Sequence, residues 1–220
     1  MKTLLQVAVS AAFLGAMQGA FAVSLVPDVV TPLPGTTVAA EPQLAGVVLA
    51  DETTPYSFFD GVGINSGTVQ SRVVRSDVDG TLDFYWRVVS SAGQGGDIGA
   101  FRIANFMTSA YNANWRSDGL GNVAPSAARL FGGAGGDVNF LFGGGTAGST
   151  FSPGAESFFM FLDTNATNYA KTATYDLTGT GAGNISLSYA TFAPAVPEPA
   201  TYAMFGVGLL AIAALRRRRS

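Results

Sequence analysis

The sequence predicts an all-β protein whose body is a single β-sandwich of jelly-roll type. Short apolar runs recur about every 10 to 20 residues, and Gly, Asn, Asp and Ser separate them. Between the two ends of the chain, no long segment carries the 3.6-residue apolar period of an amphipathic helix. The 16 phenylalanines would fill the space between two facing sheets.

The clearest predicted strand covers residues 81–89, where apolar and other residues alternate. It follows Asp79-Gly80, a tight-turn signal, and a valine-rich run at 68–78 precedes that turn. We therefore expect a hairpin. The side chains expected on one face are Leu82, Phe84, Trp86 and Val88, and those on the other are Asp83, Tyr85, Arg87 and Val89.

Further strands are predicted in the rest of the body, which we place at residues 44–195. They cover residues 98–106, 128–131, 137–142, 157–164, 172–178 and 184–192. Residues 23–43 are rich in proline and predict an extended lead-in that carries one edge strand.

Composition excludes several function classes. The chain has no cysteine, so an exported form has no disulfides and depends on its core. It also has no histidine, which excludes serine–histidine and cysteine–histidine nucleophile systems and the commonest transition-metal ligand. We expect no cofactor, no metal site and no enzyme activity.

The charge is divided unequally along the chain. Residues 23–195 hold 14 of the 15 acidic residues and only seven of the 12 basic ones, which gives this exported part a net charge of about −7. An acidic body argues against nucleic-acid binding, which requires a basic surface.

The N-terminus has the three parts of a secretory signal peptide at residues 1–22. Lys2 is the positive region, residues 4–16 are mostly apolar, and Ala20 and Ala22 are the small residues that signal peptidase recognises. We predict cleavage after Ala22. The alternative is a retained anchor helix, for which the apolar part is short.

The last residues, 196–220, combine three signals. The two prolines of Pro197-Glu198-Pro199 keep the backbone of this motif extended. Residues 200–215 are apolar and would span roughly 24 Å as a helix, slightly less than a hydrocarbon core. The arginines that follow favour the cytoplasmic side, so the body would lie outside. They are Arg216, Arg217, Arg218 and Arg219.

This order of motif, apolar helix and terminal arginines resembles the PEP-CTERM sorting tail of exported proteins in Gram-negative bacteria. The resemblance implies a transient inner-membrane anchor and processing near the motif by an exosortase, a membrane enzyme. It also implies delivery of the body to the cell surface or the exopolysaccharide matrix. An ordinary single-span membrane anchor is the alternative.

Candidate sites in the body are weak. The glycine loops at 132–136 and 143–145 lack the lysine or helix of a phosphate site. Asp77 and Asp79 have the opening spacing of a calcium loop without its later ligands, so a hairpin turn explains them better. Scattered acids such as Glu41, Glu52 and Glu156 predict no catalytic pair.

Tyr111, Trp115 and Arg116, with neighbouring asparagines, form the one candidate glycan contact. Exposed aromatic side chains beside amides commonly bind sugars, because the ring stacks on the sugar and the amide forms hydrogen bonds with its hydroxyl groups. The alternative is that Trp115 is a core residue that fills the space at one end of the sandwich. Two function classes stay open: a structural protein of the surface or exopolysaccharide matrix, and an extracellular carbohydrate-binding module.

The signal peptide gives the first testable prediction. Protein recovered from the envelope or the medium should begin at Val23, because Ala20 and Ala22 satisfy the small-residue requirement of signal peptidase. N-terminal sequencing checks this, and mature protein that still carries Met1 would contradict it.

Overall fold

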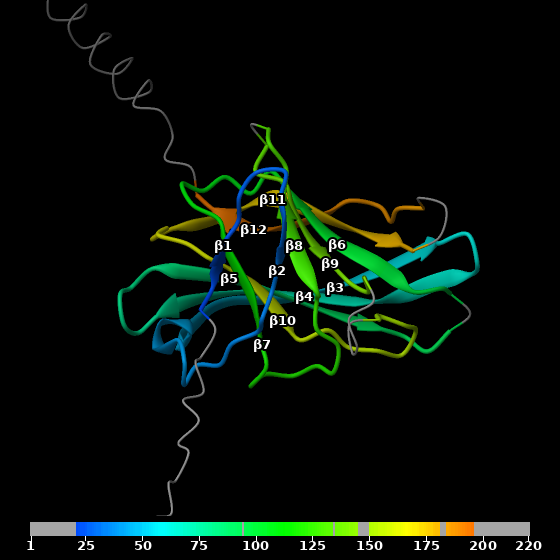
Figure 1. Cartoon of the computed structure of the whole chain (residues 1–220), viewed down its shortest axis with the longest axis horizontal. Helices are drawn as coiled ribbons and strands as arrows, with labels where there is room; N and C mark the ends of the chain where they lie inside the picture. The colour runs from blue at the N-terminus through cyan, green and yellow to red at the C-terminus, as the bar shows by residue number, and fades with distance from the viewer. Residues whose placement is uncertain (1–20, 94, 134, 145–149, 181–183, 196–220) are drawn as a thin grey trace, which may run out of the picture.

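The computed structural model describes residues 21–93, 95–133, 135–144, 150–180 and 184–195, and confirms the all-β prediction. Two six-stranded antiparallel sheets pack face to face as a β-sandwich (Figure 1). Sheet A has the order β1-β7-β10-β5-β4-β3 and sheet B the order β12-β11-β6-β9-β8-β2. Within the described residues the one short helix is the 3-10 turn η1 (Pro42–Leu44).

The strands of sheet A include the longest of the fold, which run across Figure 1. They are β1 (Val23–Ser24), β3 (Gly46–Phe59), β4 (Ile64–Ser76), β5 (Leu82–Ser90), β7 (Asn112–Arg116) and β10 (Phe159–Asp163). Those of sheet B are β2 (Val30–Pro32), β6 (Ile98–Ala104), β8 (Ala127–Leu130), β9 (Val138–Leu141), β11 (Tyr169–Gly179) and β12 (Tyr189–Pro194).

The predicted hairpin at 68–89 is confirmed as β4 and β5, joined by a turn in which Gly80 has a φ of 76°. The side chains expected on one face lie in the core: Leu82, Phe84 and Val88 are fully buried, and Trp86 is 1% exposed. The other six predicted strands also occur, with shifted ends. For example, β12 begins at Tyr189 rather than at residue 184.

β3, the 14-residue edge strand of sheet A, was not predicted from the sequence. Its polar centre includes Asp51, Glu52 and Pro55, and most of its side chains are at least partly exposed. A strand with a solvent-facing edge needs little apolar alternation, and an edge is where proline is tolerated. Pairing with β4 along its whole length therefore defines β3 more than its own residues do.

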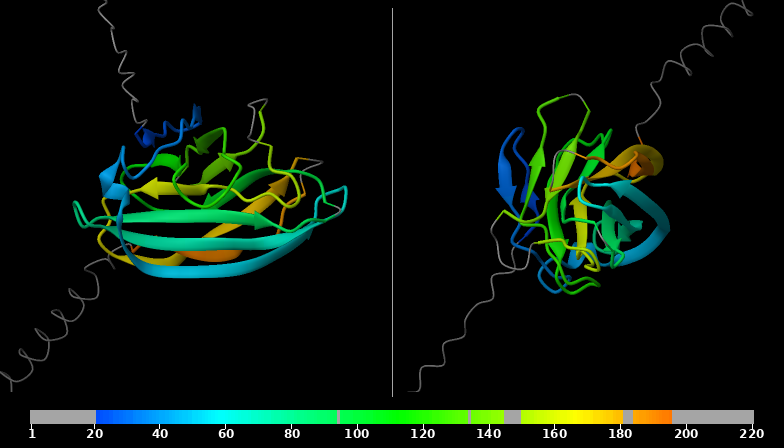
Figure 2. Two further views of the ribbon diagram at one scale, coloured as in Figure 1. Left: turned by 90° about the horizontal axis from the view of Figure 1, so that it is seen from below. Right: turned by 90° about the vertical axis from the view of Figure 1, so that its right-hand side faces the viewer.

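Residues 23–44 do more than lead into the body. They supply β1, which pairs with β7 of sheet A, and β2, which pairs with β8 of sheet B. The segment then runs into η1 and covers the outer face of sheet A (Figure 2). There it closes a second apolar cluster, formed by Leu44, Val74, Tyr85, Phe159 and Phe161.

Among the described residues, no helix is long and apolar enough to cross a membrane. The predicted signal peptide up to residue 20 and the predicted helix at 200–215 lie outside the described residues.

A buried aspartate ties two loops together at one end of the sandwich. Asp60 is 1% exposed and follows β3. Its Oδ1 accepts N–H bonds from Val62 and Gly63 at 2.8 and 2.9 Å. Its Oδ2 accepts from Gly96 N at 2.5 Å and from Asn65 Nδ2 at 2.6 Å. Asp60 thus connects the β3–β4 turn to the β5–β6 crossover.

Replacing Asp60 should test this link. Burial alone would raise the pKa of Asp60, but the N–H donors from Gly63, Val62, Gly96 and Asn65 outweigh it and lower the pKa. Asp60→Asn turns an amide N–H group toward two donors, so we expect a loss of about 2–3 kcal/mol at neutral pH.

The pH dependence gives the control for this prediction. Folding lowers the pKa of the Asp60 carboxyl. Its charged form therefore stabilises the fold at any pH above the pKa of the unfolded chain, and this stabilisation is lost as the pH falls through the pKa of the folded state. Urea unfolding should therefore show a difference between Asp60→Asn and wild type that shrinks in acid. Asp77→Asn, at an exposed turn position, should change little at any pH.

Candidate functional site

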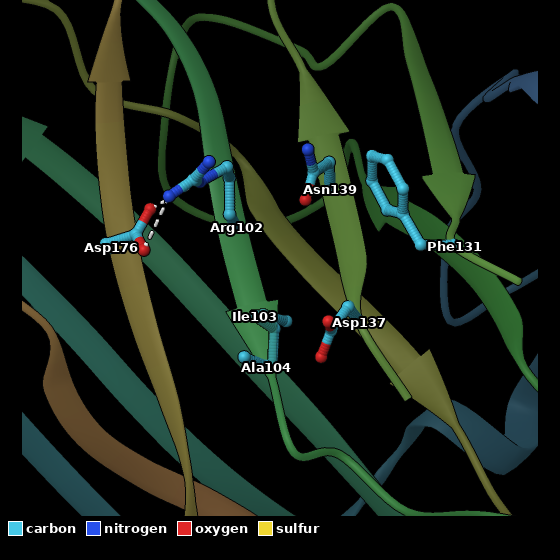
Figure 3. A pocket seen from close by; sticks show the side chains of 7 residues that line it. All are labelled: Arg102, Ile103, Ala104, Phe131, Asp137, Asn139 and Asp176. Atoms are coloured by element: carbon cyan, nitrogen blue, oxygen red, sulfur yellow. Dashed lines mark hydrogen bonds and ion pairs between the residues drawn. The ribbon is translucent and has the colours of Figure 1, made fainter. Parts of the chain in front are cut away.

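The outer face of sheet B carries a row of polar side chains that four strands bring into register. Asp176 of β11 lies beside Arg102 of β6, which lies beside Asn139 of β9, which lies beside Arg129 of β8. Successive residues of a strand point to opposite faces, so these side chains share one face. Asp176, Arg102 and Asn139 border a shallow depression of about 250 Å³, shown in Figure 3.

Arg102 and Asp176 are locked together on one side of this depression. The guanidinium donates from Nε to Oδ1 at 2.5 Å and from Nη2 to Oδ2 at 2.8 Å. This bidentate hydrogen bond to Asp176 raises the pKa of Arg102. Both side chains of the pair are partly exposed, so polar atoms that this contact does not use are accessible at the depression.

Phe131 and Asp137 complete the other side of the depression (Figure 3). Phe131 is 37% exposed, and the Arg129 guanidinium carbon lies 4.5 Å from the centre of its ring. A ring held in this way, next to an amide and an arginine–carboxylate pair, suits a ligand with an apolar face and several hydroxyl groups.

The three residues predicted to form a glycan contact do not converge. Tyr111 and Trp115 face the core side of sheet A and pack against the core, as Ala113 between them does. Arg116 is on the opposite face by strand alternation, where its Nε donates to Asp118 Oδ1 at 2.9 Å. The three side chains therefore do not share one surface.

Contacts within the protein occupy both aromatic side chains. The Tyr111 hydroxyl donates to Phe106 O at 2.9 Å. Trp115 Nε1 donates to Leu33 O at 3.2 Å, and its ring stacks on Phe158 with centroids 5.0 Å apart. Gly35, with a φ of 79°, lies so close to the indole that a side chain there would collide with it.

The other sequence candidates have structural roles where they are described. Asp79 Oδ1 accepts from both the N–H and the hydroxyl of Thr81, which fits a turn. The glycine-rich loops lie on either side of β9, as predicted. Over the described ranges, no group of three or more acidic residues is arranged to hold a metal ion.

A carboxyl pair that the sequence did not reveal lies on the outer face of sheet A. Asp83 of β5 is directly opposite Asp163 of β10. Asp83 is 1% exposed, and neither of its carboxyl oxygens has a hydrogen-bond partner among the described residues. Burial, and then the neighbouring charge of Asp163, raise the pKa of Asp83 to about 9.

The sorting residues predicted from sequence lie outside the described part of the chain. They are Ala20, Pro197, Glu198, Pro199, Arg216, Arg217, Arg218 and Arg219. The last described residue is Ala195, which directly follows β12 and whose N–H donates to Asn168 O at 3.0 Å.

Comparison with known proteins identifies this C-terminal segment. Residues 195–219 match the PEP-CTERM protein-sorting motif. No curated protein and no solved structure matched the chain. The chain therefore carries a PEP-CTERM sorting signal at its C-terminus, and that signal begins where the last strand of the sandwich ends.

The buried carboxyl pair predicts an unusual pH dependence of stability. Between the unfolded pKa of about 3.9 and the raised folded pKa, the folded protein keeps a proton on Asp83 that the unfolded chain releases. Stability should therefore fall as the pH rises over this range. Asp83→Asn should raise the melting temperature at about pH 8 by several degrees.

The gap between Asp83→Asn and wild type should close below about pH 4, where both states are protonated. Calorimetry across this range measures it, with Asp77→Asn as the exposed control. An Asp83→Asn protein that is less stable than wild type at pH 8 would contradict the prediction.

Proposed function

We propose that this protein is exported, loses its signal peptide after Ala22 and is processed by an exosortase at Pro197-Glu198-Pro199. It then serves as a non-catalytic structural protein at the cell surface or in the exopolysaccharide matrix of a Gram-negative bacterium. The match of residues 195–219 to the sorting motif is the observation that carries this proposal.

The position of the motif in the fold supports processing close to the body. β12 is an edge strand of sheet B, and Ala195 is bonded to the loop before β11. The chain spans at most about 3.6 Å per residue, so Ala200 lies within about 18 Å of Ala195. Before processing, the folded body would therefore stay next to the membrane that holds residues 200–215.

The body supports a structural role more than catalysis. A reacting carboxyl pair must face a substrate across a cleft. Asp83, by contrast, is buried, and residues 36–44 cover the apolar cluster beside it. The body is acidic and the C-terminal end carries four arginines. This distribution is expected if the tail spans the membrane with its arginines in the cytoplasm and the body lies outside.

Two tail variants test the proposal in the native host. Glu198→Ala leaves the signal peptide and the apolar segment intact, so export should continue while processing fails. The longer form should then stay in the inner membrane. Replacing Arg216 to Arg219 by Ser removes the charges that fix the tail in the cytoplasm, so the tail should insert poorly and release protein early.

Fractionation and the mass of the mature C-terminus distinguish the two products. Processing and localisation of Glu198→Ala like those of wild type would argue for an ordinary membrane anchor instead of a sorting signal.

A second candidate function is binding of a neutral glycan at the depression on sheet B. The planar groups of Arg102, Asn139 and Asp176, with the exposed ring of Phe131, offer hydrogen bonds and stacking to a sugar. The net charge of about −7 on residues 23–195 disfavours acidic polysaccharides by repulsion. This face, rather than the Trp115 region, would serve a carbohydrate-binding module.

Affinity electrophoresis in gels that contain dextran, a mixed-linkage β-glucan or alginate tests this candidate. Retardation should occur in a neutral gel and be absent in alginate. Phe131→Ala should weaken binding about five- to tenfold, the value of one aromatic contact. Phe59→Ala, at a ring 58% exposed on sheet A, is the matched control. Equal retardation of the two variants would exclude this face.

A further inference from the structure

Glu41 is a buried carboxylate whose hydrogen bonding depends on the residue before the predicted cleavage site. It precedes η1 and is 1% exposed. Its Oε1 accepts the backbone N–H of Ala22 at 2.5 Å. Its Oε2 is buried and has no described donor within hydrogen-bond distance, although the nearby Thr36 side chain, whose hydroxyl is also buried, acts against burial to lower the pKa of Glu41. A buried carboxylate is costly unless it is paired, so a further donor or a positive charge is needed here.

The surroundings of Glu41 add negative charge instead. Asp163 of β10 acts electrostatically on Glu41, and Glu41 and Asp79 act on Asp83. None of the ion pairs between described residues includes Glu41, Asp83 or Asp163. The basic residues on this face are paired with other carboxylates: Arg72 with Asp51, Arg87 with Glu156 and Arg116 with Asp118. Burial, the leading cause, raises the pKa of both Glu41 and Asp163.

β1 holds the future N-terminus at this place. Val23 pairs with Ala113 and Ser24 with Asn112 of β7. Ala22 itself packs against the apolar cluster under η1. The nitrogen of Val23 is one residue along the chain from the nitrogen that bonds Glu41.

Signal removal changes the chemistry at this point. Hydrolysis of the Ala22–Val23 bond consumes one water, leaves a carboxylate on the departing signal peptide and creates an α-ammonium group at Val23. The N–H of Ala22 is lost with the signal peptide. Glu41 therefore loses the backbone donor of Ala22 and keeps only the nearby Thr36 side chain when a positive charge appears one residue away.

We infer that the α-ammonium group of Val23 in the mature protein binds the buried carboxylate of Glu41, so that signal removal completes the charge balance of this face. The inference rests on the proposed cleavage after Ala22. An ammonium group has three donors and can serve Glu41 while β1 stays paired. The N-terminus is thus a structural part of the folded body, and the mature chain is more stable than one whose terminus is uncharged.

The mature chain offers a clean measurement, because Val23 and Lys171 carry its only two amines. Exported protein labelled with ¹³C is followed by NMR against pH at the carbons that carry the two amines, Val23 Cα and Lys171 Cε, so that both amines keep all their N–H donors. The pKa of the Val23 amine should exceed the ordinary 7.7–8.0 by about one unit or more. In concentrated urea it should return to that range.

Matched variants separate Glu41 from the general acidity of the body. Glu41→Gln should lower the pKa of the Val23 amine toward its value in urea. Glu52→Gln removes an exposed carboxylate that binds Lys171 Nζ at 2.7 Å, so it should affect the Lys171 signal and leave Val23 unchanged. Neutral acylation of Val23 in Lys171→Arg protein should lower the melting temperature by about 3 °C or more.

The wild-type protein alone is enough to overturn the inference, whether or not the Glu41 variant folds. A Val23 terminus whose native pKa equals its value in urea overturns the ion pair and leaves the proposed export intact. Sequencing that finds another N-terminal residue overturns both the cleavage site and the ion pair.

Discussion

The packing of the two sheets depends on one buried tryptophan and the polar link that it makes. Trp86 of β5 contacts the rings of Phe101 and Phe106, and its Nε1 donates to Thr191 Oγ1 at 2.8 Å. Thr191 lies on β12 of the other sheet and in turn donates to Ser71 of β4. Buried polar groups must be paired, so this link forms only when β12 is in register. In a chain without cysteine, it fixes the last strand before the sorting signal.

The sequence was sufficient to predict strands that have one apolar and one polar face. It was insufficient to predict strands that form only because a neighbouring strand pairs with them. Alternation identified β5, and Asp79-Gly80 identified its hairpin. The edge strand β3 has a polar centre and no such signal, so it was missed. β1 and β2 are only two and three residues long, and their distribution over both sheets follows from tertiary pairing that local pattern does not encode.

The candidate sites also divide into those that are contiguous in the sequence and those that only strand pairing assembles. The sorting tail is a linear signal, so residues 195–219 could be recognised without a fold. Tyr111, Trp115 and Arg116 are close in sequence, yet strand alternation puts Arg116 on the outer face while the two aromatic side chains pack against the core. Asp176, Arg102 and Asn139 are far apart in sequence, and only the register of three strands brings them together. The pairing of Asp83 with Asp163 needed the register of β5 and β10.

The outer edge of sheet A determines how concentrated copies of the body would meet. An exposed edge strand is a template for pairing with another molecule, which leads to aggregation. β3 places Asp51, Glu52 and Pro55 along this edge, and charged side chains and proline are the features that block such pairing. Crowded copies of the body would therefore stay separate folded units, and their association would be left to side-chain surfaces instead of continuous intermolecular sheets.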